Sequence, residues 1–122
     1  MTPHFRREEL LCKCGCGLLP PQSLVDRAER VRVKFGKPMP VTSGARCPEY
    51  NAKVSTTGRN GPHTKGALDF GLRGADALTV IGIALREGFT GIGVNQKGDK
   101  RFVHLDDLPN EPGQPRPFIW SY

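Results

Sequence analysis

The sequence contains no long apolar run. Its longest apolar stretch, residues 77–85, is interrupted by Thr79 and Gly82 and is far shorter than the roughly 20 residues that a membrane-spanning helix needs. Residues 1–19 have neither an uninterrupted apolar core nor a small-residue cleavage site, so we expect no secretion signal. These absences predict a protein that is made in the cytoplasm and is not inserted into a membrane.

The chain also lacks internal repeats, low-complexity segments and blocks of like charge. Its 122 residues match the usual size of one domain, which leaves no room for a cofactor domain beside a separate substrate domain. Hydrophobic residues at 37% and charged residues at 25% can supply a small core and argue against disorder. We therefore expect a single domain over residues 1–122, acting as a monomer.

Basic residues are in excess. Eighteen Lys and Arg against twelve Asp and Glu give a net charge of +6, which favours polyanionic surroundings such as nucleic acid, an acidic cell wall or a membrane surface. The basic residues are spread along the chain and are not interleaved with aromatic residues, as they would be in a nucleic-acid-binding patch. We therefore expect no nucleic-acid partner.

Apolar spacing predicts two helices. Apolar residues at three- and four-residue steps indicate one helix between Pro21 and Gly36 and another over residues 75–86. The second helix is expected to bury a broad face made of Ala77, Leu78, Ile81, Ala84 and Leu85. A short helix is expected to begin at Cys47-Pro48, because proline suits the first helical position.

Short apolar runs predict four strands, two of them joined by a Gly98-Asp99 hairpin turn: residues 39–42, 66–72, 90–95 and 101–105. This pattern predicts an α+β fold, with a small antiparallel sheet and helices packed on one side. Residues 1–19 form a Cys/Gly-rich N-terminal segment, and residues 55–62 have the composition of a mobile loop. The Pro-rich tail over residues 108–122 is expected to wrap the surface in extended form, with Trp120 and Tyr122 packed over the sheet edge or lining a groove.

His63, Asp69 and His104 form the strongest candidate site. Zinc binds imidazole nitrogen and carboxylate oxygen, and a catalytic zinc site uses three protein ligands and leaves a fourth position open. His63 at the end of a Gly/Pro loop and two residues inside neighbouring strands can converge on one ion. On this pattern alone the same three residues can equally be structural or exposed.

Three segments carry a resemblance to a known family: Thr42 to Pro48 (TSGARCP), His63 to Asp69 (HTKGALD) and Phe102 to Asp106 (FVHLD). In this order they resemble the zinc D-alanyl-D-alanine metallopeptidase family, and most closely its small phage and prophage members, which cut peptidoglycan peptides. The similarity extends from Phe5 to the C-terminal Trp120-Ser-Tyr, nearly the whole chain. It implies a fold like that of hedgehog and D-Ala-D-Ala peptidase domains.

The resemblance also implies a function and a site. One catalytic zinc ion would be held by His63, Asp69 and His104, and Arg46 would face the carboxylate of the substrate or the developing oxyanion. A guanidinium suits both tasks, because it is permanently charged and forks to a carboxylate. Ser43 is a second candidate donor to the same group. The expected activity is endolysin-like D,D-carboxypeptidase or endopeptidase cleavage of peptidoglycan stem peptides, at the cell wall, after release from the cell or as a virion component.

One departure concerns the general base. Better-known relatives place a glutamate three residues before the last zinc histidine, or a histidine two before it, and here these positions hold Arg101 and Phe102. The remaining candidate is Asp106, which lies on the same strand face as His104. It is predicted to act as base and carry a proton to the leaving amine; orienting a ligand histidine and a plain loop carboxylate are the alternatives. Asp107 would point to the opposite face.

Four cysteines, Cys12, Cys14, Cys16 and Cys47, are many for so short a chain. They can form a second, structural zinc site, one disulfide such as a link to Cys47, or free buried thiols. Their spacing is tighter than the usual two to four intervening residues of a zinc knuckle, so we expect only the catalytic zinc. The missing glutamate keeps open a different function, a zinc-stabilised binding domain of the same fold without peptidase activity.

Overall fold

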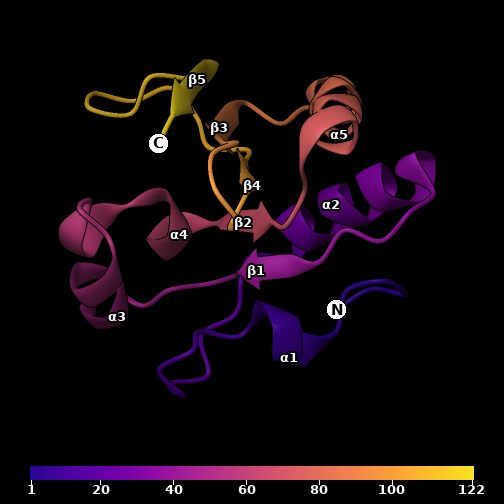
Figure 1. Cartoon of the computed structure of the whole chain (residues 1–122). Coiled ribbons are helices and arrows are strands. Elements are labelled where there is room, and N and C mark those ends of the chain that lie inside the picture. The colour runs from indigo at the N-terminus through magenta and orange to yellow at the C-terminus, as the bar shows by residue number, and fades with distance from the viewer.

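The computed structural model describes residues 1–122 and shows five strands, five α-helices and one 3₁₀ turn (Figure 1). In chain order these are α1 (Arg7–Leu10), α2 (Gln22–Phe35), β1 (Val41–Ser43), α3 (Pro48–Val54), η1 (Gly58–Asn60), α4 (Pro62–Lys65), β2 (Ala67–Phe70), α5 (Gly74–Arg86), β3 (Gly91–Asn95), β4 (Phe102–Asp106) and β5 (Phe118–Ser121). The predicted α+β class, the two long helices and the four strands are confirmed. The short helices α1 and α4 were not predicted.

The five strands form one sheet in the order β1-β2-β4-β3-β5. Pairs β1/β2, β2/β4 and β3/β4 are antiparallel, and β3 and β4 form the predicted hairpin. The last residues of the tail are extended and mostly exposed, as predicted, but as β5 they also pair with β3 in parallel, so the predicted antiparallel sheet is in fact mixed. The tail therefore contributes an edge strand.

The main apolar core lies between one face of the sheet and the two long helices. Figure 1 shows α2 and α5 together on this face. The strands contribute alternate residues, among them Leu68, Phe70, Val103 and Leu105, as expected from the two-residue period of a strand. α2 buries Leu24, Val25, Ala28 and Val31, and it ends at Gly36 with φ 76°, a conformation that favours glycine.

The predicted buried face of α5 was partly wrong. The helix buries Ala77, Val80 and Ala84, whereas Leu78 and Leu85 are 73% and 54% exposed. Small side chains on the buried stripe let α5 lie close to α2 and the sheet, so the larger leucines on the neighbouring stripe face solvent. None of the helices is both long enough and apolar enough to span a membrane.

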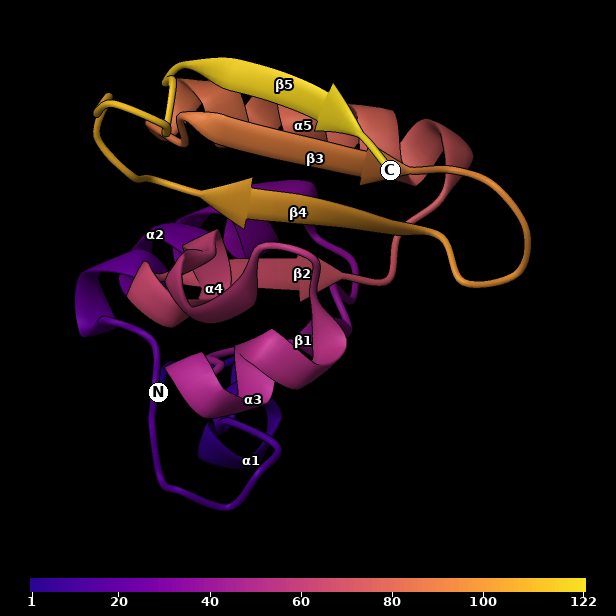
Figure 2. The same ribbon diagram turned by 90° about the vertical axis from the view of Figure 1, so that its left-hand side faces the viewer.

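The opposite face of the sheet carries the polar residues of interest. Figure 2 shows α3 and α4 in front of this face, with α2 and α5 behind it, so the prediction of helices on one side holds for the long helices only. α3 begins as predicted, with Pro48 at its first position and the Cys47 sulfur accepting a hydrogen bond from Tyr50 N. Where a mobile loop was expected, residues 55–62 contain η1 and the start of α4.

Candidate metal centre

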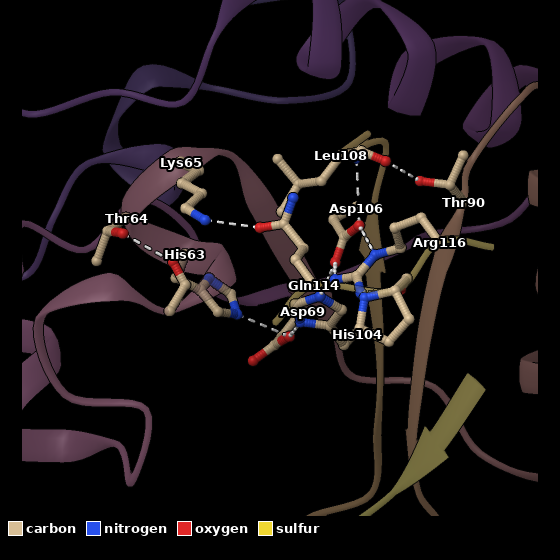
Figure 3. Close-up of polar contacts among 12 residues, drawn as sticks. His63, Thr64, Lys65, Asp69, Thr90, His104, Asp106, Leu108, Gln114 and Arg116 are labelled. Carbon is tan, nitrogen blue, oxygen red and sulfur yellow. Dashed lines mark hydrogen bonds and ion pairs between the residues drawn. The ribbon is translucent and has the colours of Figure 1, made fainter. Parts of the chain in front are cut away.

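His63, Asp69 and His104 meet at one point on the sheet face covered by α3 and α4. Asp69 on β2 and His104 on β4 are register partners. His63 belongs to α4, which covers the same face of the sheet. Asp69 Oδ1 lies 3.1 Å from His63 Nε2 and 3.1 Å from His104 Nδ1 (Figure 3). All three side chains are buried. The structure therefore brings together the three residues that the sequence pattern singled out.

The outer nitrogens of both rings are already used in hydrogen bonds. His63 Nδ1 donates to the Gly44 carbonyl oxygen over 2.8 Å, and His104 Nε2 donates to Asp106 Oδ2 over 2.7 Å. Because these partners only accept, His63 Nε2 and His104 Nδ1 are left as bare nitrogens. In these tautomers two lone pairs point at one carboxylate oxygen, and a cation shared by the three groups would satisfy all of them.

The donor set fits zinc. Two imidazole nitrogens and a carboxylate oxygen, all within 4.8 Å of one another, can be placed on one ion, since zinc ligands at about 2.0–2.2 Å lie about 3.4 Å apart in a tetrahedron. A fixed tautomer of each histidine is the usual support for such a ligand. The site is therefore a candidate zinc centre.

The electrostatics of the site favour a positive charge between the ligands. Burial by itself would raise the pKa of Asp69, but the hydrogen bonds and charges of His104 and His63 outweigh it and hold this pKa far below its ordinary range. Burial by itself would lower the pKa of His104, and the Asp106 and Asp69 carboxylates raise it instead.

Asp106 lies on the far side of His104 from Asp69. It is fully buried, and its two oxygens bind the Arg116 guanidinium, with Nε 2.9 Å from Oδ1 and Nη2 2.8 Å from Oδ2. Burial would raise the pKa of Asp106, but hydrogen bonds with His104 and Arg116 lower it to about 2. This geometry gives no support to the predicted role as general base, because the carboxylate is buried and fully paired; it favours the alternative, orientation of His104. Asp107 instead pairs with Arg27.

Two glycines on β3 leave space for the side chains that contact His104 and Asp106. A Cβ on Gly91 would overlap the Asp106 carboxylate and the Arg116 guanidinium, and one on Gly93 would lie 2.7 Å from the Trp120 indole. Trp120 therefore packs flat against the sheet, with its ring 4.8 Å from that of His104 and 5.1 Å from the Arg116 guanidinium carbon. Trp120 packs over the sheet, as expected, and it also supports a ligand.

Arg46 lies at the mouth of the site. Its Nη2 is 3.7 Å from Asp69 Oδ2, while Nε donates to Ser43 Oγ and Nη1 donates to Asn51 Oδ1. Asn51 is buried and also donates to Thr57 Oγ1 over 2.9 Å. In this structure Ser43 therefore holds Arg46, and its predicted role in substrate binding stays a prediction.

An open cleft of about 550 Å³ leads to His63, Asp69 and His104, with Arg46, Trp120 and Tyr122 among its other lining residues. A second groove of about 730 Å³ adjoins it and shares Arg46, Asp69 and Phe102. Its walls carry Arg73, Lys100 and Arg101 against one further acid, Asp99. The candidate metal centre thus opens onto a cleft with an adjoining basic groove.

Sequence reasoning missed several supporting residues. Glycines at alternate positions of a strand signal a close approach of another group, so Gly91 and Gly93 offered a usable signal. Arg116 lies in a Pro-rich segment with no pattern that points to it, and Gly44 contributes only its backbone carbonyl. The four cysteines gather beside Arg46, apart from the metal centre.

An α+β domain whose sheet presents two bare imidazole nitrogens and a carboxylate to an open cleft has the architecture of a metal-dependent hydrolase. Comparison with protein families gives the particular family: the model described as Peptidase M15 matches residues 3–106, most of the chain. The chain belongs to the Peptidase M15 family, a family of metallopeptidases, and this confirms the resemblance seen in the sequence. The family implies the hedgehog/D-Ala-D-Ala peptidase fold. Searches of curated proteins and of solved structures found no match.

Proposed function

We propose that the protein is a zinc-dependent peptidase that hydrolyses an amide bond in peptidoglycan stem peptides or cross-links. The observation that carries this proposal is the convergence of His63 Nε2, Asp69 Oδ1 and His104 Nδ1 at the end of an open cleft, beside a guanidinium. A closed structural site would offer four ligands and no cleft. Membership of the Peptidase M15 family supports peptide hydrolysis.

The chain supplies the ligands and fixes their orientation. Gly44 and Asp106 hold the two histidines with their bare nitrogens toward Asp69, so little reorganisation accompanies binding. When bound, zinc supplies a Lewis acid that polarises the scissile carbonyl and activates water. Trp120 and the buried Asp106–Arg116 pair keep solvent from the back of His104.

Arg46 is the proposed anchor for the substrate. Its Nη2 already faces the Asp69 carboxylate at 3.7 Å, so a substrate carboxylate or a developing oxyanion near the ligands comes within its reach. Ser43 and Asn51 fix the guanidinium from behind, which lowers the entropy lost on binding. Burial raises the pKa of Tyr122, so its hydroxyl stays protonated as a further donor at the cleft.

The adjoining groove suits an acidic peptide. Peptidoglycan stem peptides carry free carboxylates, and Arg73, Lys100 and Arg101 line the groove beyond Arg46. A net charge of +6 would in addition hold the enzyme to an anionic wall. We further propose that it works as a monomer and, as in endolysins, reaches the wall after release from the cell or as part of a virion.

A second candidate function rests on one specific observation: the cleft contains no carboxylate other than Asp69. With Asp106 committed to His104, the cleft itself offers a proton taken from water only the outer oxygen of Asp69 or solvent, and the next carboxylate is Asp99 in the adjoining groove. A zinc-stabilised binding domain of the same fold would need no base at all. This alternative predicts zinc binding and peptide binding without turnover.

Digestion of purified peptidoglycan by the zinc-loaded protein, followed by mass spectrometry of the muropeptides, separates the two functions. New stem-peptide fragments should appear with the wild type and be absent with His104→Ala, and their masses identify the bond. His4→Ala is the matched control, since His4 is an exposed histidine bound to Glu29 and far from the cleft. Intact stem peptides under zinc-replete conditions would rule out the peptidase and favour the binding domain.

A further inference from the structure

Four cysteine sulfurs lie together beside the metal centre but outside it. Cys12, Cys14 and Cys16 come from the segment between α1 and α2, and Cys47 comes from the N-terminus of α3. Their sulfurs all lie within 4.8 Å of one another, with Cys14 Sγ 3.4 Å from Cys12 Sγ and 3.5 Å from Cys47 Sγ. A segment at residues 12–16 thus brings its sulfurs to that of a residue more than thirty positions away.

This arrangement matches neither of the simpler fates of cysteine. All four cysteines are free thiols, with no disulfide among them. Buried free cysteines behave as small apolar side chains in a core, but Cys14 and Cys16 are exposed and Cys47 is half-buried. Cys12 alone is buried, and its sulfur lies against that of the exposed Cys14. Their separations approach the roughly 3.8 Å between thiolates that share one tetrahedral zinc ion with Zn–S bonds of about 2.3 Å.

The backbone is shaped to hold the sulfurs. Gly15 and Gly17, which follow Cys14 and Cys16, have φ values of 86° and 87°, and a Cβ at either would meet no atom within 4 Å. The glycines are therefore required by conformation and not by space. Backbone amides also point at sulfur: Cys47 N donates to Cys12 Sγ over 3.3 Å and Tyr50 N donates to Cys47 Sγ over 3.4 Å. Such donors stabilise thiolates.

We infer that Cys12, Cys14, Cys16 and Cys47 bind a second, structural zinc ion. Four thiolates complete a tetrahedron and leave no open position, as in structural zinc sites. The compact C-x-C-x-C spacing, which argued against such a site in the sequence, is accommodated because the two glycines turn the chain after each thiol. This inference does not depend on the proposed peptidase activity, since it rests on a separate set of ligands.

The second zinc would stabilise the chain segment that carries Gly44 and Arg46 beside the candidate metal centre. Cys47 directly follows Arg46, and Ala45 N donates to Leu10 O over 3.0 Å on the N-terminal side of the cysteine segment. Gly44, whose carbonyl orients His63, is pressed against the Leu10 backbone so closely that a Cβ would overlap it. A metal crosslink between the N-terminal segment and Cys47 therefore fixes both the anchor Arg46 and the support of a ligand.

Metal content and cobalt substitution test the inference. Wild-type protein, purified with reductant and saturated with zinc, should carry two zinc ions per chain by native mass spectrometry. The paired variant Cys14→Ser/Cys16→Ser, which leaves only two thiolates, and His104→Ala should each carry one, and the variant with all three changes none. With cobalt in place of zinc, the thiolate-to-cobalt charge-transfer absorption should be present in His104→Ala and absent in Cys14→Ser/Cys16→Ser. Lys13→Ser, an exposed change within the same segment, is the matched control and should keep both ions.

Misfolding cannot imitate the expected result. Cys14 and Cys16 are exposed, so their replacement removes no core packing, and far-UV circular dichroism reports the fold directly. A wild type with one zinc whose content is unchanged in Cys14→Ser/Cys16→Ser would overturn the inference. So would a His104→Ala protein that binds cobalt without thiolate absorption, or four cysteines found paired as disulfides. Loss of turnover with both ions bound would instead overturn the peptidase proposal and leave this inference standing.

Discussion

At the scale of single residues, the absence of a side chain at Gly93 decides how well His104 is supported. The indole of Trp120 occupies the space where a Cβ would be, and it packs against the ring of His104 at a tilt of 58°. A candidate ligand histidine that contacts an aromatic ring and is hydrogen-bonded to Asp106 has little freedom to rotate. Preorganisation of this kind is what makes a metal site tight.

Replacement of Gly93 by alanine should therefore displace Trp120 and weaken its support of His104. The new Cβ would lie 2.7 Å from Trp120 Nε1, so the indole must move off His104, and overpacking of this kind costs about 1–3 kcal/mol of the free energy of unfolding. Zinc binding should weaken in a chelator competition, and the fluorescence of the single tryptophan should change. Gly82→Ala is the control, because nothing lies within 4 Å of that Cβ. Unchanged fluorescence and zinc affinity in Gly93→Ala would contradict this view.

Asp106 allows a sharper test, since its two candidate roles predict different measurements. Asp106→Asn keeps the shape but can donate to His104 Nε2 through its amide, which would move the ring proton to the nitrogen that faces Asp69. If Asp106 orients His104, zinc affinity should fall by about 10–100-fold, as titration against a competing chelator would show. If it is a base, affinity would be unchanged and only turnover would fall. Asp107→Asn, which breaks only the pair with Arg27, should change neither.

At the scale of whole elements, the sequence predicted what local spacing can encode. Apolar periodicity predicted α2 and α5, and the Gly98-Asp99 turn predicted the β3/β4 hairpin. Periodicity could not tell which stripe of α5 is buried, because Leu78 and Ala77 are neighbours on the helix surface and only the partner elements decide between them. β5 was missed since its pairing is parallel, distant in sequence and unmarked by alternation among the prolines.

The residues of the candidate site were likewise only partly predictable from the sequence. Motifs predicted the three ligands and Arg46, because the resemblance carries them position by position. The residues that hold them in place are ordinary in sequence: Arg116 in the tail, Asn51 in α3 and the two glycines of β3. Arg116 and Trp120 even lie beyond the residues that match the family model. Such supports follow from packing between distant segments, which no local pattern records.

The N-terminal segment is attached to α2 by a carboxylate whose titration can be followed. Glu29 accepts hydrogen bonds from His4 N over 2.9 Å and from the His4 ring. Burial would raise the pKa of Glu29, but the nearby Thr2 hydroxyl and the hydrogen bonds from His4 lower it below the ordinary value. A pKa lowered on folding stabilises the protein above the unfolded value of about 4.3, and this contribution is lost as the pH falls through the folded pKa.

Glu29→Gln should therefore lower the free energy of unfolding by about 1 kcal/mol near neutral pH, the usual net worth of such a hydrogen bond. The difference from wild type should shrink as the pH falls below about 4.3 and vanish below the folded pKa. Denaturant unfolding at a series of pH values measures this difference. Glu8→Gln, at an exposed glutamate of α1, should show no such dependence. A constant difference at all pH values would mean that the carboxylate charge plays no part.

At the scale of the whole molecule, part of the excess positive charge lies beside the candidate metal centre. Many basic side chains are paired with acids, among them Arg27, Lys34, Lys37, Arg59 and Arg116. Arg73, Lys100 and Arg101 form no ion pair, and all three line the groove beside the metal centre. These three unpaired charges thus lie where the proposed acidic substrate would lie, and they would raise its local concentration there.

Retention on purified peptidoglycan should therefore depend on salt and on this groove. Exposed charges are screened as the Debye length falls from about 10 Å at 0.1 M to about 3 Å at 1 M ionic strength, so a pull-down assay should show retention decreasing over this range. Lys100→Glu with Arg101→Glu should reduce low-salt retention severalfold. Arg7→Glu with Arg86→Glu lowers the net charge equally at exposed positions outside the groove and should reduce it much less. Equal losses from the two pairs would show that net charge alone holds the protein to the wall, and retention insensitive to salt would show that charge does not.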